Sequence, residues 1–103
     1  MSIKRQYLKS KNICKVTFKF PKEMAESAST VHLVGDFNNW DVNASPMKKL
    51  KDGSFTANID LERGREYQFR YFIDQESWQN DSEADKYTPS AYGDAENSVI
   101  VIA

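Results

Sequence analysis

The sequence predicts an all-β domain built as an antiparallel β-sandwich. Apolar and polar residues alternate with a period of two through most of the segments expected to be ordered. Turn residues separate these segments about every 8–12 residues, as in sandwich folds. Only residues 21–29 and 82–86 are compatible with a helical turn, and both stretches are short. A chain of 103 residues corresponds to one domain that buries roughly 60–65% of its unfolded surface.

The expected strands follow one another along the chain. Alternation covers residues 14–20, 55–61 and 67–73, and more continuous apolar runs cover residues 31–34 and 99–102. In residues 67–73, Gln68 and Arg70 have the parity opposite to the apolar residues, so Arg70 is expected to face outward. The Asp52-Gly53 pair lies between two of these segments and is a strong hairpin signal. Arg63-Gly64 marks the next turn. The strands are therefore expected to pair mainly through short antiparallel connections.

One turn is expected to present an aromatic ring. The run that begins at Val31 ends in Gly35, and Asn38 and Asn39 then lead to Trp40. Glycine and asparagine tolerate positive φ, so this segment should turn sharply out of its strand. Val31, Leu33 and Phe37 are expected in the core. Trp40 should lie at the mouth of the turn with one ring face available, which favours a binding surface over a reaction centre.

Composition excludes several classes of chemistry. One His and one Cys are too few for a zinc site, and no Gly-rich phosphate loop is present. Cys14 has the apolar parity of its strand and should be a buried thiol, while His32 should lie on a strand face. We therefore expect no catalytic residues, no metal and no cofactor. With no long apolar run and no leader, a soluble cytoplasmic protein is expected.

Charge is distributed unevenly along the chain. Residues 1–22 contain seven basic side chains and no acid, whereas residues 74–96 contain seven acids and a single lysine. The lysines could protect sheet edges and attract the acidic segment weakly, or they could form a groove for nucleic acid. Outward aromatics that could stack bases do not alternate with the lysines, which favours the first interpretation. Neither nucleic acid nor a membrane is expected as a partner.

An ordered set of motifs resembles a known family. The set comprises residues 35–40 (GDFNNW), the turn at 52–53, residues 69–74 (FRYFID), Trp78 and residues 96–99 (ENSV). It resembles the glycogen-binding domain of the AMP-activated protein kinase beta subunit and the early-set N-terminal domains of isoamylases and glycogen branching enzymes. These are family 48 carbohydrate-binding modules, and small free-standing bacterial domains are most similar.

The resemblance covers about residues 13–102 and treats residues 1–103 as a single domain. It implies an immunoglobulin-like (early-set) antiparallel β-sandwich. It also implies a non-catalytic module that binds α-glucan of the glycogen or maltodextrin type, with a glycogen- or starch-active enzyme as a possible protein partner.

The same resemblance implies a set of site residues. Trp40 and Trp78 would flank the sugar, Arg70 would lie on the strand between them, and Asn97 would hydrogen-bond a hydroxyl. Tyr92 falls where kinase-type domains carry an apolar residue that threads the glucan ring. Physical reasoning agrees for the aromatics, because the C–H faces of sugars stack on rings while their hydroxyl edges need donors and acceptors.

Each of these residues also has a simpler structural interpretation. The two tryptophans could plug the ends of the sandwich, Arg70 could pair with an outward acid such as Asp74, and Asn97 could turn the backbone. Tyr92 could close its own loop. The turn that precedes Trp78 is one residue longer than in kinase-type domains and lacks their glycine. The alternative function is a protein-interaction domain of the same fold that associates with glycogen-metabolism enzymes or with itself.

Overall fold

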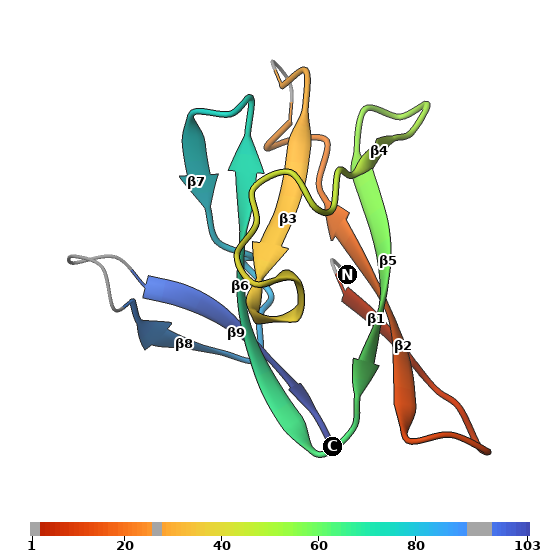
Figure 1. Cartoon of the computed structure of the whole chain (residues 1–103). Helices are drawn as coiled ribbons and strands as arrows, with labels where there is room; N and C mark the ends of the chain where they lie inside the picture. The colour runs from red at the N-terminus through yellow and green to blue at the C-terminus, as the bar shows by residue number, and fades with distance from the viewer. Residues whose placement is uncertain (1–2, 26–27, 91–95) are drawn as a thin grey trace.

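Two antiparallel sheets pack face to face in the computed structural model, which describes residues 3–25, 28–90 and 96–103 (Figure 1). The first sheet has the order β1-β2-β5-β4, and the second has the order β3-β6-β9-β8 with β7 paired to β6. The elements are β1 (Ile3–Tyr7), β2 (Ile13–Phe20), β3 (Val31–Gly35), the 3₁₀ turn η1 (Asp36–Asn38), β4 (Lys48–Lys49), β5 (Phe55–Glu62), β6 (Arg65–Ile73), β7 (Ser77–Gln79), β8 (Lys86–Pro89) and β9 (Glu96–Ile102). The predicted all-β, immunoglobulin-like sandwich is confirmed.

The short outer strands were not predicted from the sequence. In β1 only Ile3 is fully buried, so its pattern lacks the alternation that identifies a half-buried strand. The described parts of 21–29 and 82–86 contain no helix: the first forms backbone turns between Pro21 and Ala25, and in the second Lys86 begins β8. The single helical turn of the described chain is η1, where the sequence predicted only a turn.

The core lies between the facing sheets and is rich in aromatic rings. Phe18 of β2 meets Phe69 of β6 edge to face, with ring centroids 5.1 Å apart. Phe20 lies 5.0 Å from Tyr71 by the same measure. Such pairs add to the apolar area that burial removes from water. Cys14 is fully buried in this core, as predicted.

Strand β6 contributes side chains to both faces of its sheet. Tyr67, Phe69 and Tyr71 point into the core and are buried. The intervening Gln68, Arg70 and Phe72 are half-buried on the outer face. This alternation follows from the two-residue period of a strand. Arg70 therefore lies on the outer face, as its parity predicted.

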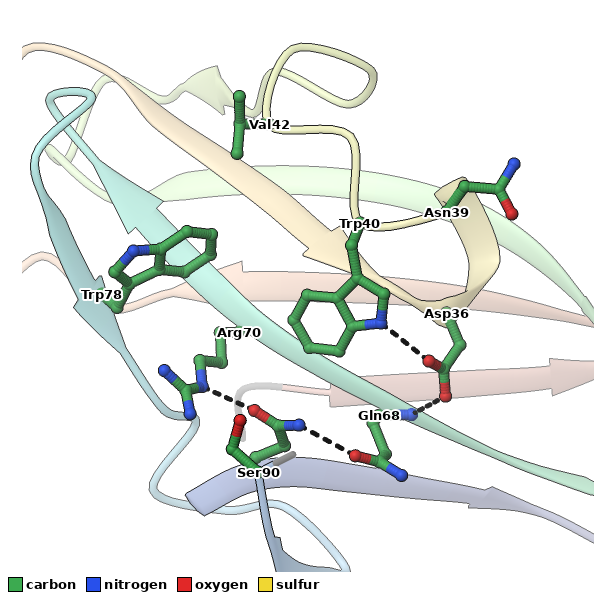
Figure 2. Close-up of a pocket in the computed structure, with 9 residues that line it drawn as sticks. Asp36, Asn39, Trp40, Val42, Gln68, Arg70, Trp78 and Ser90 are labelled. Carbon is green, nitrogen blue, oxygen red and sulfur yellow. Dashed lines mark hydrogen bonds between the residues drawn. The ribbon is translucent and has the colours of Figure 1, made fainter. Parts of the chain in front are cut away.

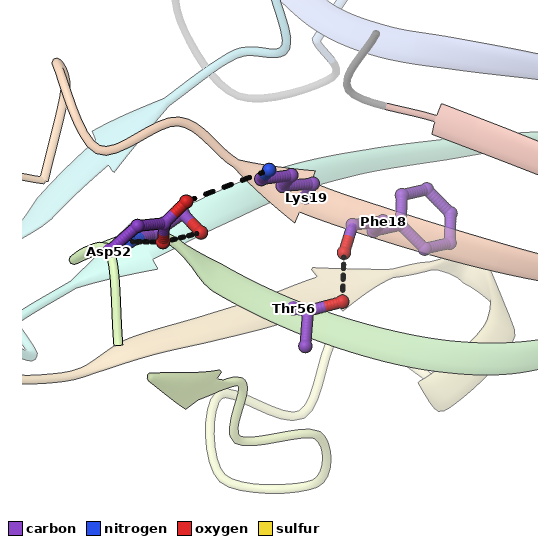
Figure 3. A network of polar contacts seen from close by, with 5 residues as sticks. Phe18, Lys19, Asp52 and Thr56 are labelled. Carbon is purple, nitrogen blue, oxygen red and sulfur yellow. Dashed lines mark hydrogen bonds and ion pairs between the residues drawn. The ribbon is translucent and has the colours of Figure 1, made fainter. Parts of the chain in front are cut away.

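Among the described residues, two ion pairs involve the basic N-terminal part of the chain. Arg5 of β1 pairs with Asp85, which also accepts a hydrogen bond of 2.7 Å from the Val101 backbone N–H. This contact connects the edge of one sheet to the edge of the other, in line with the predicted attraction between the basic and acidic segments. Lys19 contacts Asp52 at 3.9 Å across the neighbouring β4–β5 turn (Figure 3).

The β4–β5 turn is organised by Asp52. Its Oδ1 accepts hydrogen bonds from the backbone N–H and the hydroxyl of Ser54, at 2.9 and 2.6 Å. These bonds, helped by the charges of Lys19 and Lys22, lower the pKa of the Asp52 carboxyl. Beside the turn, Thr56 donates to the Phe18 carbonyl at 3.2 Å (Figure 3). The predicted hairpin signal thus corresponds to a real turn.

A buried polar contact attaches the segment after β7 to the core. The Tyr71 hydroxyl donates to Asp81 Oδ2 at 2.7 Å, and Asp81 N–H donates to the Ser98 hydroxyl at 2.9 Å. Asn80 Oδ1 accepts from the Ser98 backbone N–H at 3.0 Å. Burial, and then the charge and hydrogen bond of Asp81, raise the pKa of Tyr71 well above the ordinary tyrosine value. This buried network therefore fixes the path of the chain between β7 and β8.

Neighbouring phenylalanines on β6 should respond differently to truncation. Phe69→Ala removes a fully buried ring and should lower the free energy of unfolding by about 3–5 kcal/mol. Phe72→Ala removes a half-buried outer ring and should cost about 1 kcal/mol, mainly its contact with Trp78. Urea titration followed by circular dichroism measures both. Equal losses would contradict the assignment of the two faces.

Stability should fall in alkali because of Tyr71. The folded state keeps this phenol protonated, whereas the unfolded chain loses the proton near pH 10. Stability is therefore complete below pH 10 and decreases as the pH rises above it. Tyr71→Phe should cost about 1–3 kcal/mol at pH 7, because Asp81 loses a buried donor. Urea midpoints between pH 7 and 11 should decline less steeply for the variant, and equal slopes would refute the role of Tyr71.

Candidate functional site

A concave pocket of about 660 Å³ lies on the outer face of the sheet that contains β6 (Figure 2). Its lining comes from β6, β7, β9, the loop that follows β3, and the residue after β8. The lining residues are Asp36, Asn39, Trp40, Val42, Gln68, Arg70, Trp78, Ser90 and Asn97. Four of the five residues predicted for the site are therefore brought together by the fold.

Trp40 is held by the loop that leaves β3. Its indole Nε1–H donates to Asp36 Oδ1 at 2.8 Å, and its backbone N–H donates to the Gly35 carbonyl at 2.9 Å. Asn39 and Trp40 both have left-handed backbone conformations, with φ of 58° and 57°. This conformation is unusual for a bulky residue such as tryptophan. The loop thus uses its hydrogen bonds to keep one ring in a specific orientation.

Gly35 is required where β3 approaches β6. A Cβ atom at this position would lie 2.4 Å from the Gln68 carbonyl oxygen and 2.8 Å from Phe69 Cβ. Both distances are shorter than the non-bonded contacts that Cβ atoms make in proteins. A residue with a Cβ would therefore push β3, whose following loop carries Trp40, away from β6, which carries Arg70. The glycine of the GDFNNW motif serves close packing, and Asn39 provides the positive φ.

Trp78 reaches the pocket from a short hairpin. Strand β7 pairs with β6 so that Trp78 lies opposite Phe72, and their rings stack with centroids 4.3 Å apart. The turn contains no glycine, yet Asp74 and Gln75 adopt left-handed conformations with φ of 51° and 61°. Asp74 Oδ1 accepts hydrogen bonds from the backbone N–H groups of residues 29 and 30, at 2.7 and 2.8 Å. Trp78 remains 41% exposed, which contradicts its interpretation as a plug.

Backbone strain is concentrated at the pocket. All non-glycine residues with positive φ in the described chain are Asn39, Trp40, Asp74 and Gln75. Asn39 and Trp40 lie in the loop after β3, and Trp40 is itself a pocket residue. Asp74 and Gln75 belong to the turn that leads to Trp78. Each such conformation costs about 1–3 kcal/mol for ordinary residues and persists only where other contacts enforce it. Here the side-chain hydrogen bonds of Asp36 and Asp74 are among those contacts.

Arg70 is oriented by amides rather than by a carboxylate. Its Nε–H donates to Asn97 Oδ1 at 2.6 Å, and Asn97 Nδ2 donates to Gln68 Oε1 at 2.8 Å. Neither Nη nitrogen of Arg70 has a hydrogen-bond or ion-pair partner within residues 3–25, 28–90 and 96–103. Asp74 is engaged elsewhere, so the alternative pairing of Arg70 with Asp74 does not occur. In Figure 2 the Arg70 side chain lies below the Trp78 indole, and its guanidinium points away from Trp40.

Asn97 does not turn the chain into the last strand. It lies within β9, opposite Thr88 of β8, and only 6% of its surface is exposed. Both polar ends of its side chain are bound to neighbouring side chains. The interpretation of Asn97 as a turn residue is therefore wrong.

The pocket lining is partly apolar, because it includes the indoles of Trp40 and Trp78. Val42 adds an apolar side chain from the loop above the indoles (Figure 2). A pocket with apolar walls and a few fixed polar groups is typical of ligand-binding sites.

The sequence did not identify several lining residues. Asp36 belongs to the recognised motif, and its acceptor role depends on contacts that the sequence does not specify. Gln68 was recognised only by its outward parity, and Val42 carries no signal at all. Tyr92 lies outside the described residues, so its predicted role stays a prediction. In the described part of the chain, no group of three or more His, Cys, Asp or Glu side chains could hold a metal ion.

Two further sequence predictions concern residues away from the pocket. His32 is on a strand face, as predicted, and its Nδ1 lies 3.1 Å from Gln75 Nε2. Among the described residues, no helix is long and apolar enough to cross a membrane.

Residues 11–93 match the family described as carbohydrate-binding module 48 (isoamylase N-terminal domain). The chain belongs to this family. The match confirms the resemblance found in the motifs, and it includes Trp40, Arg70 and Trp78 but ends before Asn97.

Individual relatives are branching enzymes. The chain is 39% identical over 71 residues to the 1,4-alpha-glucan branching enzyme of Aquifex aeolicus, covering 66% of this chain and 10% of that enzyme. It is 46% identical over 46 residues to the enzyme of the same name from Photobacterium profundum, covering 44% of this chain and 6% of the enzyme. The chain thus spans a tenth or less of the length of these relatives.

Removal of the Asp36 acceptor should loosen Trp40. In Asp36→Ala the indole Nε1–H loses its partner, and its hydrogen exchange should become about tenfold faster, the equivalent of about 1.4 kcal/mol. NMR spectra of ¹⁵N-labelled protein resolve the two indole signals and measure this exchange. Asp41→Ala is the matched control, because Asp41 Oδ1 accepts from the Asn43 backbone instead. Unchanged exchange in Asp36→Ala would show that this bond does not hold the ring.

Proposed function

We propose that this module binds α-glucan chains without catalysis, through the pocket between Trp40 and Trp78. The observation that carries the proposal is the convergence of both indoles and the Arg70 guanidinium on one concave surface (Figure 2). Membership of carbohydrate-binding module 48 supports it. The names of the branching-enzyme relatives supply the class of polymer, 1,4-alpha-glucan.

The chemistry of the lining suits a sugar chain. Indole faces complement the C–H faces of glucose units, while Arg70 offers hydrogen-bond donors to the hydroxyl edges. About 100 Å² of apolar contact on each indole corresponds to roughly 2–3 kcal/mol before the cost of ordering the ligand. A dissociation constant of about millimolar to micromolar is therefore expected for short oligosaccharides.

The shape of the pocket favours a curved chain. A hollow surface wraps around a ligand that bends, whereas a straight, flat ribbon such as a β-1,4-glucan stacks best on a flat platform. The two tryptophans come from separate elements, the loop after β3 and the hairpin strand β7. A curved α-1,4-glucan can therefore contact both rings at once.

Intrinsic fluorescence provides a direct test. Both tryptophans of the chain line the pocket, so the emission reports on this site alone. Titration with maltoheptaose should give a saturable change, and cellohexaose should give none. Trp78→Ala should weaken binding about 30-fold or more, the equivalent of about 2 kcal/mol, while the domain stays folded because the ring is 41% exposed.

Controls separate the site from the fold. Arg63→Ala removes a cation whose guanidinium lies over the Tyr7 ring and not in the pocket, so maltoheptaose binding should be unchanged. No saturable signal from the wild-type protein up to about 10 mM maltoheptaose, the weak end of the expected range, would refute α-glucan binding. Loss of binding in step with loss of folded protein in Trp78→Ala would assign that ring to the core.

A further inference from the structure

A chain of directed hydrogen bonds crosses the pocket floor (Figure 2). The Arg70 guanidinium can only donate, so the Asn97 atom that faces its Nε, at 2.6 Å, must be the carbonyl Oδ1. The amide Nδ2 of Asn97 then faces Gln68 at 2.8 Å and donates to it. The facing atom of Gln68 must therefore be Oε1. Chemistry alone determines the orientation of both amides.

This order turns the amide nitrogen of Gln68 away from Asn97. Gln68 Nε2 has no hydrogen-bond partner among the described residues. The Gln68 side chain is half-buried and lines the pocket. Asn97, by contrast, is 6% exposed and has both side-chain ends engaged. The accessible polar group of this pair is thus the Gln68 amide.

The carboxylate of Asp36 beside these amides is already engaged. Asp36 Oδ1 accepts from the Trp40 indole, and its Oδ2 accepts from the Gln68 backbone N–H at 2.8 Å. Near it, the two Nη nitrogens of Arg70 and Nε2 of Gln68 are donors with no partner among the described residues. A ligand that binds over these three nitrogens presents oxygen acceptors to them.

We propose that Gln68 is an additional ligand-contacting residue, and that Asn97 is a positioning residue that turns the Gln68 amide nitrogen toward the ligand. The proposal rests on the proposed function, because it assigns the sugar hydroxyl oxygens as acceptors for these donors. A glucose hydroxyl can donate or accept. The donors of the floor select the accepting orientation and discriminate against chains whose oxygens are blocked or turned away.

Two substitutions of Gln68 test the contact. Gln68→Glu keeps the shape and an acceptor for Asn97 but replaces the outward donor with a carboxylate oxygen, so the Kd for maltoheptaose should rise at least about tenfold. Gln68→Met is similar in size, adds no charge and should weaken binding about fivefold or more. Gln79→Glu is the matched control, because Gln79 is exposed on β7 outside the pocket lining and should leave the Kd within twofold.

Asn97→Asp separates positioning from contact. The carboxylate still accepts from Arg70 but cannot donate, so the Gln68 amide should rotate and present Oε1 to the pocket. Maltoheptaose binding should weaken about as much as in Gln68→Glu. At the same time, the Nε–H signal of Arg70 should keep its slow hydrogen exchange by NMR, which shows that Arg70 itself remains held.

The outcomes are distinct. Wild-type binding with a tenfold loss in Gln68→Glu, a loss in Gln68→Met and none in Gln79→Glu supports the proposal. Wild-type binding with both Gln68 variants within twofold overturns it and leaves α-glucan binding intact. Absence of wild-type binding refutes the proposed function and this inference together. Weakened binding in Asn97→Asp with rapid Arg70 exchange would assign Asn97 to holding Arg70 alone, and overturn its role toward Gln68.

Discussion

The pairing of β6 with its neighbours is the constraint on which the other features depend. Strand β6 pairs with β3, β7 and β9, and its alternate residues build the core and the pocket. A slip of one residue would exchange Phe69 with Arg70, placing a cation in the core and an aromatic ring in solvent. The close contact at Gly35 matches β3 to β6 at this point. Core packing therefore also determines where the Arg70 side chain lies.

The local sequence pattern was sufficient for the parts of the fold that depend on burial. Alternation predicted the long strands, and it placed Arg70 on the outer face, because a period of two follows directly from strand geometry. The edge strands β1 and β8 escaped this reasoning. In β8 no residue is fully buried, and in β1 only Ile3 is. Neither strand therefore has the alternating apolar face from which a strand is predicted. Their place in the sheets comes from backbone pairing with β2 and β9.

The pocket was predictable only as far as family motifs reach. The resemblance named both tryptophans, and the structure places them in one pocket. It did not show that Asn97 would be buried and bound at both ends, since that depends on side chains 27 and 29 residues away in sequence. Nor did it identify Gln68, whose backbone meets a carboxylate 32 residues earlier. Contacts of this kind arise from register between distant strands, and no local pattern encodes them.

The one carboxylate among the described lining residues of the pocket is committed to structural contacts. Hydrolysis of a glycosidic bond ordinarily uses a pair of carboxyl groups on opposite sides of the bond. Of the described residues that line the pocket, Asp36 alone carries a carboxylate. Both of its oxygens already accept hydrogen bonds, one from an indole and one from the backbone. Such a carboxylate holds its neighbours in place, and the proposed α-glucan binding relies instead on ring faces and fixed donors.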